Sequence, residues 1–321
     1  MPFPVLKLLS ADEFRSGEEI SRRLGMSRAS VHNLLAQARE LGVAIQAVRG
    51  KGYRLAEPYS WLDDQRLAAA TLQGFGVQLQ QEVESTNSLL LSQAQQGQAH
   101  KSVLAAEWQS GGRGRRGRTW SSPLGGGLTF SLLWRFSRPL TALSGLSLAV
   151  GVALARGLRE SGLAAVGVKW PNDILVHGRK LAGILIETHG DMLSAATAVI
   201  GIGVNVRALP EQTPAADYAA AAIEEVLGRQ FDRNELLLRL LAELDAVLKV
   251  FDLEGFAPFR MEWQSLHVWQ DQPVRVLGGA SAPLEGVALG VDEAGVLQLA
   301  TADGVRGIHS GEVSLRPGTP A

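Results

Sequence analysis

The 321-residue sequence predicts an α/β protein with a small helical unit before its main domain and a small β module after it. Two closely spaced helix patterns and a hairpin pattern open the chain. Between residues 66 and 268, apolar strand-like runs alternate with amphipathic stretches. Short apolar runs fill residues 270–317, separated by glycine-containing turns at 278–279, 292–295 and 302–304. We therefore expect three units, at residues 1–57, 66–268 and 269–321, with a short proline-containing linker between the first two.

The composition indicates a folded protein of the cytoplasm. Hydrophobic residues make up 46% of the chain and charged residues 20%, enough apolar material for a sizeable core. The chain has no cysteine, which excludes a disulfide scaffold, a thiol nucleophile and a cysteine zinc site. Its first residues lack the charged segment and apolar core of a signal peptide, and no 18-residue apolar run follows. We expect no membrane partner.

Residues 5–55 predict a helix-turn-helix followed by a hairpin. Ser16 begins a capping box, in which its side chain accepts from the amide of Glu19 and Glu19 reaches back. Gly25 ends that helix, and Ser27 caps a second one. Two strand-like runs then flank a basic turn at 49–52. This order is typical of a winged helix-turn-helix.

The second helix and the wing carry side chains suited to DNA. Residues 1–60 hold nine Lys or Arg against six Asp or Glu, which favours an anionic partner. Such a helix reads base edges in the major groove while a basic wing contacts phosphates. A helical docking module with a solvated hairpin is the alternative. The candidate DNA contacts are Ser27, Arg28, Ser30, His32, Asn33, Arg49 and Lys51.

The central domain alternates predicted strands and helices. Apolar positions at helical spacing predict a helix over 143–159, and Asp232 caps a second, longer one. The predicted strands are 103–108, 127–134, 166–169, 181–187 and 198–206.

A glycine- and arginine-rich run, Gln109 to Trp120, interrupts these strands. Glycines let backbone amides converge on an anion, and guanidinium groups donate in pairs to phosphate or carboxylate. The alternative is a disordered arginine–glycine tract that binds RNA. Such tracts lie in long low-complexity regions, whereas this run is a single excursion between two apolar strands. It matches neither the Walker A spacing nor the dinucleotide fingerprint. We interpret it as a loop for a small-molecule anion.

This run and four further motifs closely resemble those of biotin–protein ligases, in the order that the family shows. The other motifs are Ser85–Asn87, Lys169–Asp173, Arg179–Glu187 and Gly201–Asn205. With a winged helix in front, the chain resembles the bifunctional bacterial type, which combines a biotin–[acetyl-CoA carboxylase] ligase with a biotin-operon repressor. The resemblance implies a mixed-sheet ligase domain of the class II synthetase-like type and a C-terminal SH3-like barrel.

The resemblance also implies an activity. Biotin and ATP, with Mg²⁺, would form biotinyl-5′-AMP, and the biotinyl group would pass to a lysine of the biotin carboxyl carrier protein of acetyl-CoA carboxylase. The ligand-loaded protein would form a homodimer on operator DNA. Biotin would thus be a substrate and the precursor of the corepressor.

Site residues follow from the same resemblance. Fixed cations and Mg²⁺ would stabilise the charge that accumulates when a carboxylate attacks phosphorus. The catalytic candidates are Arg115, Lys169, Asp173 and Lys180, with Asp173 beside Mg²⁺. The biotin contacts are Ser85, Thr86, Asn87, Gln109, Arg113, Gly114, Arg115, Trp120, Lys180, Gly183 and Gly203, the last two allowing close approach to the sheet. The ATP or adenylate contacts are Arg113, Arg115, Arg116, Lys169, Asn172, Lys180, Asn205 and Arg316.

Two other functions stay open. One is a ligand-sensing transcription regulator whose ligase chemistry has decayed, and the other is a lipoate–protein ligase with the same adenylation logic. Intact Lys180 argues against the first, and the motif Lys169–Asp173 against the second. One departure concerns the segment Arg207–Tyr218, which has no tryptophan where some family members pack one on adenine. We expect its nucleotide contact to differ.

Overall fold

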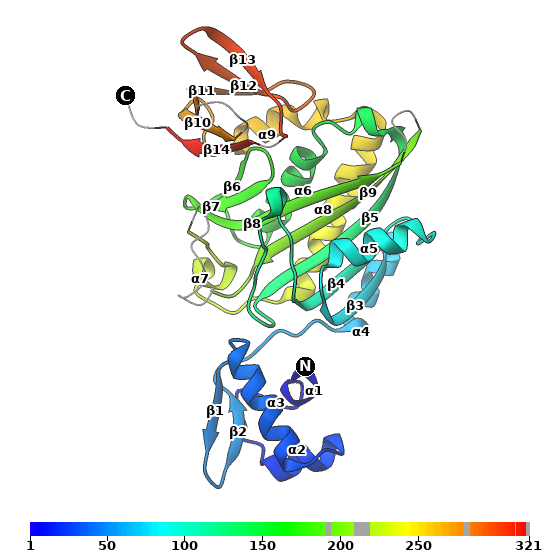
Figure 1. Ribbon diagram of the computed structural model, residues 1–321, viewed down its shortest axis with the longest axis vertical. Coiled ribbons are helices and arrows are strands. Elements are labelled where there is room, and N and C mark those ends of the chain that lie inside the picture. The colour runs from blue at the N-terminus through cyan, green and yellow to red at the C-terminus, as the bar shows by residue number, and fades with distance from the viewer. Residues whose placement is uncertain (191–193, 209–218, 279–282, 312, 319–321) are drawn as a thin grey trace.

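The structure is a computed structural model with an α/β architecture, as predicted (Figure 1). It contains a two-stranded sheet, a seven-stranded mixed sheet and a five-stranded antiparallel sheet. Figure 1 shows the seven-stranded sheet in the middle of the molecule, with the small N-terminal unit at one end and the five-stranded sheet at the other. The structure describes residues 1–190, 194–208, 219–278, 283–311 and 313–318.

The N-terminal unit has the predicted helix, turn, helix and hairpin. Ser16 and Ser27 cap the two main helices by accepting from the amides of Glu19 and Ser30. Gly25 ends the first of them at a φ of 62°, which favours glycine. Its elements are α1 (Phe3–Leu6), α2 (Gly17–Leu24), α3 (Arg28–Glu40), β1 (Ile45–Val48) and β2 (Gly52–Leu55).

The second half of the predicted capping box was wrong. Glu19 does not reach back to the cap but pairs with Arg15 at 3.0 Å and with Arg23 at 3.1 Å. Two guanidinium groups attract a carboxylate more strongly than one neutral amide does.

The linker after this unit is packed rather than free. Tyr59 stacks on Trp61 with ring centroids 5.1 Å apart, and Trp61 meets Phe3 of α1 edge-on at 6.1 Å. Leu124, from the loop before β5 (Gly127–Pro139), is buried in the same cluster as the N-terminal core. Aromatic packing therefore joins the helix-turn-helix to the central domain.

A buried ion pair fixes the linker from the other side. Arg233 and Glu107 have side chains that are each 1% exposed, and they pair at 2.6 Å. Arg233 also donates to the carbonyls of Ser60 and Gly127, while Glu107 accepts from the amide of Leu62. Two buried charges are tolerated because their remaining hydrogen bonds are satisfied.

The central sheet has the order β3-β4-β5-β9-β8-β7-β6, in which β3 and β4 are parallel and the other neighbours antiparallel. The predicted strands are confirmed, but β3 and β7 were missed. β3 lies at an edge and carries glutamines instead of an apolar run, and β7 is four residues long and begins at Asp173, the last residue of the motif Lys169–Asp173. The remaining strands are β3 (Gly76–Val83), β4 (Ser102–Gln109), β6 (Val166–Lys169), β7 (Asp173–Val176), β8 (Arg179–His189) and β9 (Ala195–Asn205).

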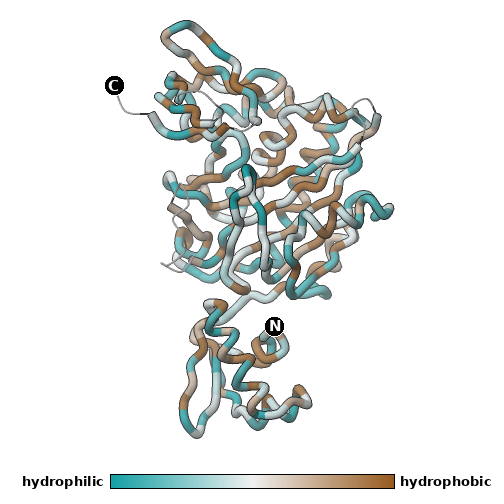
Figure 2. Tube along the Cα trace, in the orientation of Figure 1, coloured by the Kyte–Doolittle hydropathy of each residue, from teal (hydrophilic) through white to brown (hydrophobic). Residues whose placement is uncertain are grey.

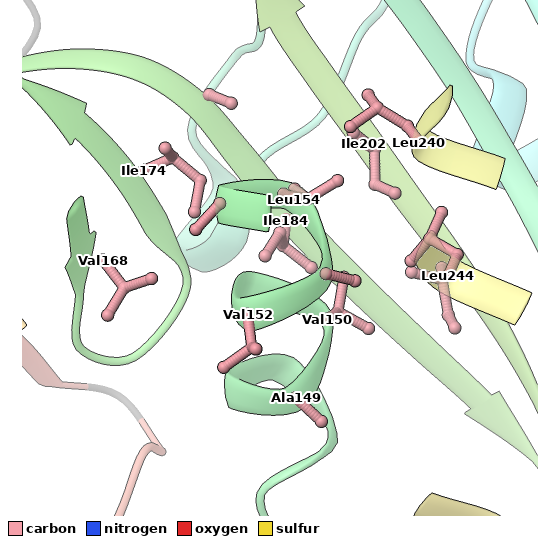
Figure 3. Packing of buried hydrophobic residues seen from close by; sticks show 14 of the residues in the cluster. Ala149, Val150, Val152, Leu154, Val168, Ile174, Ile184, Ile202, Leu240 and Leu244 are labelled. Carbon is pink, nitrogen blue, oxygen red and sulfur yellow. The ribbon is translucent and has the colours of Figure 1, made fainter. Parts of the chain in front are cut away.

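Helices cover both faces of this sheet. The helices α6 (Leu146–Glu160) and α8 (Arg233–Glu254) share one hydrophobic cluster with the sheet, and α5 (Thr86–Gln95) packs on the other face. Figure 3 shows side chains of α6 and α8 directed at those of β8 and β9. α6 is buried almost all round and not on one face, since it lies between the sheet, α8 and α9 (Arg260–Leu266). The shorter helices are α4 (Asp64–Leu67), η1 (Ala68–Gln73), η2 (Arg115–Gly117), η3 (Leu140–Ala142), α7 (Ile223–Leu227) and η4 (Ala257–Phe259).

The C-terminal sheet is the expected antiparallel module, with the order β13-β12-β11-β10-β14. The predicted turns at 292–295 and 302–304 are confirmed, whereas Gly279 lies outside the described residues. β13 was missed because it is mostly exposed and has no apolar alternation. Figure 2 shows hydrophobic residues along the strands of the central sheet and more hydrophilic ones in the wing. The strands are β10 (Pro273–Gly278), β11 (Leu284–Val291), β12 (Leu297–Thr301), β13 (Gly304–Ile308) and β14 (Val313–Pro317). Among the described residues, no helix has the length and apolarity needed to cross a membrane.

His267, between α9 and β10, gives the fold a measurable pH dependence. It is 5% exposed and stacks on Trp263 at 4.7 Å, and burial lowers its pKa to about 4. Between pH 6.5 and 4 the unfolded chain binds a proton that the folded chain does not, so the free energy of unfolding should fall on acidification, by up to roughly 3 kcal/mol. Urea unfolding across this range measures it. His267→Phe should lose this contribution to the pH dependence of the free energy of unfolding. An equal pH dependence for both proteins would contradict the assignment.

Candidate functional site

A cavity of about 800 Å³ lies where β3 and β4 end, over β8 and β9, beneath the loop that joins β4 to β5. Figure 1 shows this loop in front of the sheet. Of the residues predicted for biotin, ATP and catalysis, all but Arg316 line the cavity. They are Ser85, Thr86, Asn87, Gln109, Arg113, Gly114, Arg115, Arg116, Trp120, Lys169, Asn172, Asp173, Lys180, Gly183, Gly203 and Asn205.

A buried polar network forms part of the cavity wall. Gln109, at the end of β4, accepts from the amide and the hydroxyl of Thr86 at 2.7 and 3.0 Å. The Ser131 hydroxyl lies 2.8 Å from that of Thr86 and donates to Asn87 at 2.7 Å, while Ser85 caps α5. These contacts fix both donors and acceptors at the cavity. Sequence reasoning missed Ser131; its only signal was a lone serine in an apolar strand.

Two lysines share one carboxylate in the cavity. Lys169 Nζ lies 2.9 Å from one oxygen of Asp173, and Lys180 Nζ lies 2.6 Å from the other. The register of β6 and β7 places Lys169 opposite Asp173, and Lys180 extends from β8. Burial would raise the pKa of Asp173, but Lys180 and Lys169 hold it below its ordinary value. Burial lowers the pKa of Lys169, against the attraction of Asp173.

Asp173 does not fit the predicted role of metal ligand in this arrangement. Both of its oxygens already face ammonium groups. Within the part of the chain that the structure describes, no group of three or more His, Cys, Asp or Glu side chains is placed to hold a metal ion. The charges available to a ligand anion here are those of lysine and arginine.

The arginines of the β4–β5 loop have different partners. Arg113 donates to both oxygens of Glu187 at 2.9 and 2.8 Å. Arg115 donates to Asn172 at 3.2 Å and to the carbonyls of Ser310 and Gly311, which precede β14. Burial lowers the pKa of Arg115, and Arg116 is exposed. One arginine thus ties the loop to the central sheet and another to the C-terminal module.

Trp120, in the second half of this loop, lies against the sheet inside the cavity. A Cβ atom on Gly203 would stand 2.3 Å from the indole, and one on Gly183 would stand 3.4 Å away. Lys180 Nζ is 5.7 Å from the ring centroid. The indole nitrogen is buried without a hydrogen-bond partner among the described residues. The predicted opening above Gly203 is therefore filled by Trp120, so we assign this glycine to seating the indole and not to direct approach of a ligand.

Arg316 lies beside the cavity rather than in its wall. It donates to Ser314 at 2.7 Å. Burial is the main cause that lowers the pKa of Lys169, and the charge of Arg316 lowers it further. Ser314 and Val313 form the wall instead, which brings β14 to the site. Neither was predicted, since a short apolar run gives no sign of which residue faces another domain.

The predicted DNA contacts lie together on the N-terminal unit. Arg28, Ser30, His32 and Asn33 are exposed on α3, and Arg49 and Lys51 are exposed at the hairpin tip. The Ser27 hydroxyl, by contrast, is engaged in capping α3. The Ser30 hydroxyl lies 2.9 Å from that of Ser27. A helix with exposed polar side chains beside a basic wing is the arrangement that reads a major groove and its phosphates.

Comparisons with known proteins agree with this arrangement. The model of the biotin/lipoate A/B protein ligase family matches residues 79–205, an HTH domain matches 4–54, and a biotin protein ligase C-terminal domain matches 271–316. The bifunctional ligase/repressor BirA of Escherichia coli is 37% identical over 98% of this chain and 97% of its own length. The chain belongs to the biotin protein ligase family. Within that family it is of the bifunctional ligase and repressor type.

Further relatives of this ligase support the same assignment. BirA of Bacillus subtilis is 31% identical over 95% of both chains. The structure of the biotin protein ligase from Aquifex aeolicus in complex with biotin and ATP aligns with a TM-score of 0.64 at 31% identity, covering 75% of this chain and 99% of that one.

Gly203→Ala should weaken biotin binding by about tenfold or more, because the added methyl group displaces the indole from its seat. Calorimetric titration with biotin measures the change. Gly76→Ala is the control, since a Cβ there meets nothing within 4 Å. Equal dissociation constants for the two variants would show that the seat of Trp120 does not matter for biotin.

Proposed function

We propose that this ligase joins biotin to AMP, using ATP, and transfers the biotinyl group to a lysine of the biotin carboxyl carrier protein of acetyl-CoA carboxylase. The observation that carries the proposal is the pair of ammonium groups, Lys169 and Lys180, held by Asp173 in a cavity that also contains a buried polar network. The similar Aquifex aeolicus structure was solved with biotin and ATP.

The first half-reaction requires cations because two anions must meet. A biotin carboxylate oxygen attacks the α-phosphorus of ATP, the bond to pyrophosphate breaks, and a mixed anhydride forms. Lys180 contacts the carboxylate and the α-phosphate, and Lys169 and Arg115 stabilise the charge that develops on the phosphate oxygens. Asp173 keeps both lysines charged and oriented. Since Asp173 does not fit Mg²⁺ here, the stabilisation that we propose rests on these cations.

The second half-reaction releases AMP. The neutral amine of the carrier lysine attacks the carbonyl carbon of the anhydride, an amide bond forms, and AMP leaves with the bonding electron pair, while the proton lost by the nitrogen passes to solvent. The β4–β5 loop keeps water from the anhydride until then, with Arg115 holding it against the C-terminal module.

The polar and apolar parts of biotin match different walls of the cavity. Thr86 and Gln109, with Ser85 and Asn87, offer donors and acceptors to the ureido ring. Trp120 supplies an apolar surface for the hydrocarbon part. Adenine and ribose are left to Asn172, Asn205, Arg116 and the side of the cavity near Arg316.

The N-terminal unit gives the second activity. We propose that residues 1–57 bind operator DNA, that residues 66–268 hold the ligase site, and that residues 269–321 complete it. A ligand-loaded homodimer would place two recognition helices on a palindromic operator, with half-site spacing set by the dimer axis. ATP and operator DNA are both present in the cytoplasm, where we expect this protein to act.

The enzymatic proposal is tested with purified protein, ATP, radiolabelled biotin or lipoate, and an apo carrier domain. Biotin should be transferred and lipoate should not. Lys180→Met should reduce adenylate formation by at least about a hundredfold, because it removes a charge that faces the reacting anions. Lys249→Met, which removes an exposed ammonium group that pairs with Asp245 on α8, is the control. Preference for lipoate would reassign the substrate, and no transfer of either acid would leave a regulator without ligase chemistry.

The regulatory proposal is tested by gel shift on biotin-operon DNA with and without biotin plus ATP. Operator affinity should rise at least about tenfold with both ligands, because only the loaded protein dimerises. Arg49→Ala should weaken binding in both conditions through lost phosphate contacts. The same operator affinity with and without ligand would refute ligand-dependent repression.

A further inference from the structure

A carboxylate behind the cavity wall has no role in the chemistry above. Glu187, near the end of β8, does not line the cavity, and its side chain is 25% exposed. It nevertheless contacts two residues that do line it. Its Oε2 accepts from Asn87 Nδ2 at 2.8 Å, and both of its oxygens accept from Arg113 at 2.8 and 2.9 Å.

Asn87 connects this carboxylate to the polar network of the cavity wall. Asn87 is 3% exposed, it lies against Gly201, and its amide oxygen accepts from Ser131 at 2.7 Å. Ser131 in turn lies 2.8 Å from Thr86, which donates to Gln109. The contacts therefore run without a break from the end of β4, through α5 and β5, to β8 and back to the loop.

We propose that Glu187 is a positioning residue that anchors the first limb of the β4–β5 loop, through Arg113, to the wall that receives the ureido ring. Its carboxylate neutralises Arg113, so this guanidinium fixes the loop rather than binding the phosphate or carboxylate of a ligand. The inference rests on the proposed ligase function and assigns the ligand anions to Lys169, Lys180 and Arg115 instead.

The energetics favour an anchor over an incidental surface pair. An exposed arginine–carboxylate pair contributes little, because two mobile side chains must be ordered and water screens them. Here the carboxylate is already held by buried Asn87, so only Arg113, which is 47% exposed, loses freedom. Losing a charge-assisted hydrogen bond in this position should shift the equilibrium between the anchored and the released β4–β5 loop by roughly three- to tenfold.

The test compares Glu187→Gln, Glu187→Asp and Arg113→Gln with the wild-type protein. Glu262→Gln is the matched control, because it removes a carboxylate that also holds an arginine, Arg156, at 2.8 Å between α6 and α9. The first readout needs no ligand: trypsin cleavage after the exposed residues Arg116 and Arg118 should accelerate roughly three- to tenfold in Glu187→Gln and in Arg113→Gln, but not in the control. Glu187→Asp should retain part of the protection.

The second readout separates positioning from catalysis. The KM for biotin should rise roughly three- to tenfold in Glu187→Gln, while kcat at saturating biotin and the KM for ATP stay within about twofold. The double variant Arg113→Gln with Glu187→Gln should be no worse than either single variant, since both remove the same contact. Unfolding midpoints measured beside these values show whether a variant is simply unstable.

Cleavage of Glu187→Gln at the wild-type rate would overturn the anchor, as would additive effects in the double variant. A fall in kcat with unchanged KM would instead make Glu187 part of the chemistry and would also contradict the proposal. If the wild-type protein forms no biotinyl adenylate, the proposed function fails, whereas the ligand-free trypsin measurement still decides the anchor.

Discussion

Two ammonium groups sharing the carboxylate of Asp173 are the contact around which the ligase site is arranged. Lys169 is 4% exposed, and without a neighbouring anion burial would drive it towards its neutral form. The short pairing of β6 with β7 supplies that anion at a fixed distance. A ligand carboxylate or phosphate therefore meets cations that are already charged and oriented, and little reorganisation is needed when negative charge develops.

The β4–β5 loop connects the ligase site to the other parts of the molecule. Arg113 contacts Glu187 on the central sheet, Arg115 contacts carbonyls of the C-terminal module, and Leu124 is buried with the N-terminal core. Trp120, between these points, lies on the sheet at Gly203. A ligand that moves the indole acts on a segment whose contacts extend into all three parts of the molecule, which is what linkage between the ligand site and the DNA-binding unit requires.

An interaction could be predicted from the sequence where residues close together in the chain determine it, and not where it forms between distant segments. Helix caps such as Ser27, and the motif residues around Lys180, follow local patterns, so the predicted helices, the winged unit and the cavity lining could be identified. β13 escaped because it is mostly exposed and shows no apolar alternation, and β3 escaped because its apolar residues Val77 and Leu79 are few and stand among glutamines. The partner of Glu19 depended on arginines one helical turn away. The lysine–carboxylate pairing, the filled space above Gly203 and the contacts of Arg115 arise only when strands and domains meet, and no single segment encodes them.

The buried pair of Arg233 and Glu107 also bears on DNA binding. The pair holds the linker through Ser60 and Leu62, and Trp61 packs on Phe3. The helix-turn-helix is therefore joined to the central domain by a packed linker and not by a flexible one. A flexible tether would let each recognition helix sample many positions, and a dimer would lose entropy when it fixed both on one operator. With a packed linker, this entropy is lost when the chain folds and not when the dimer binds DNA. In the homodimer that we propose, half-site spacing then follows from the geometry of the ligase domains, which hold the cavity.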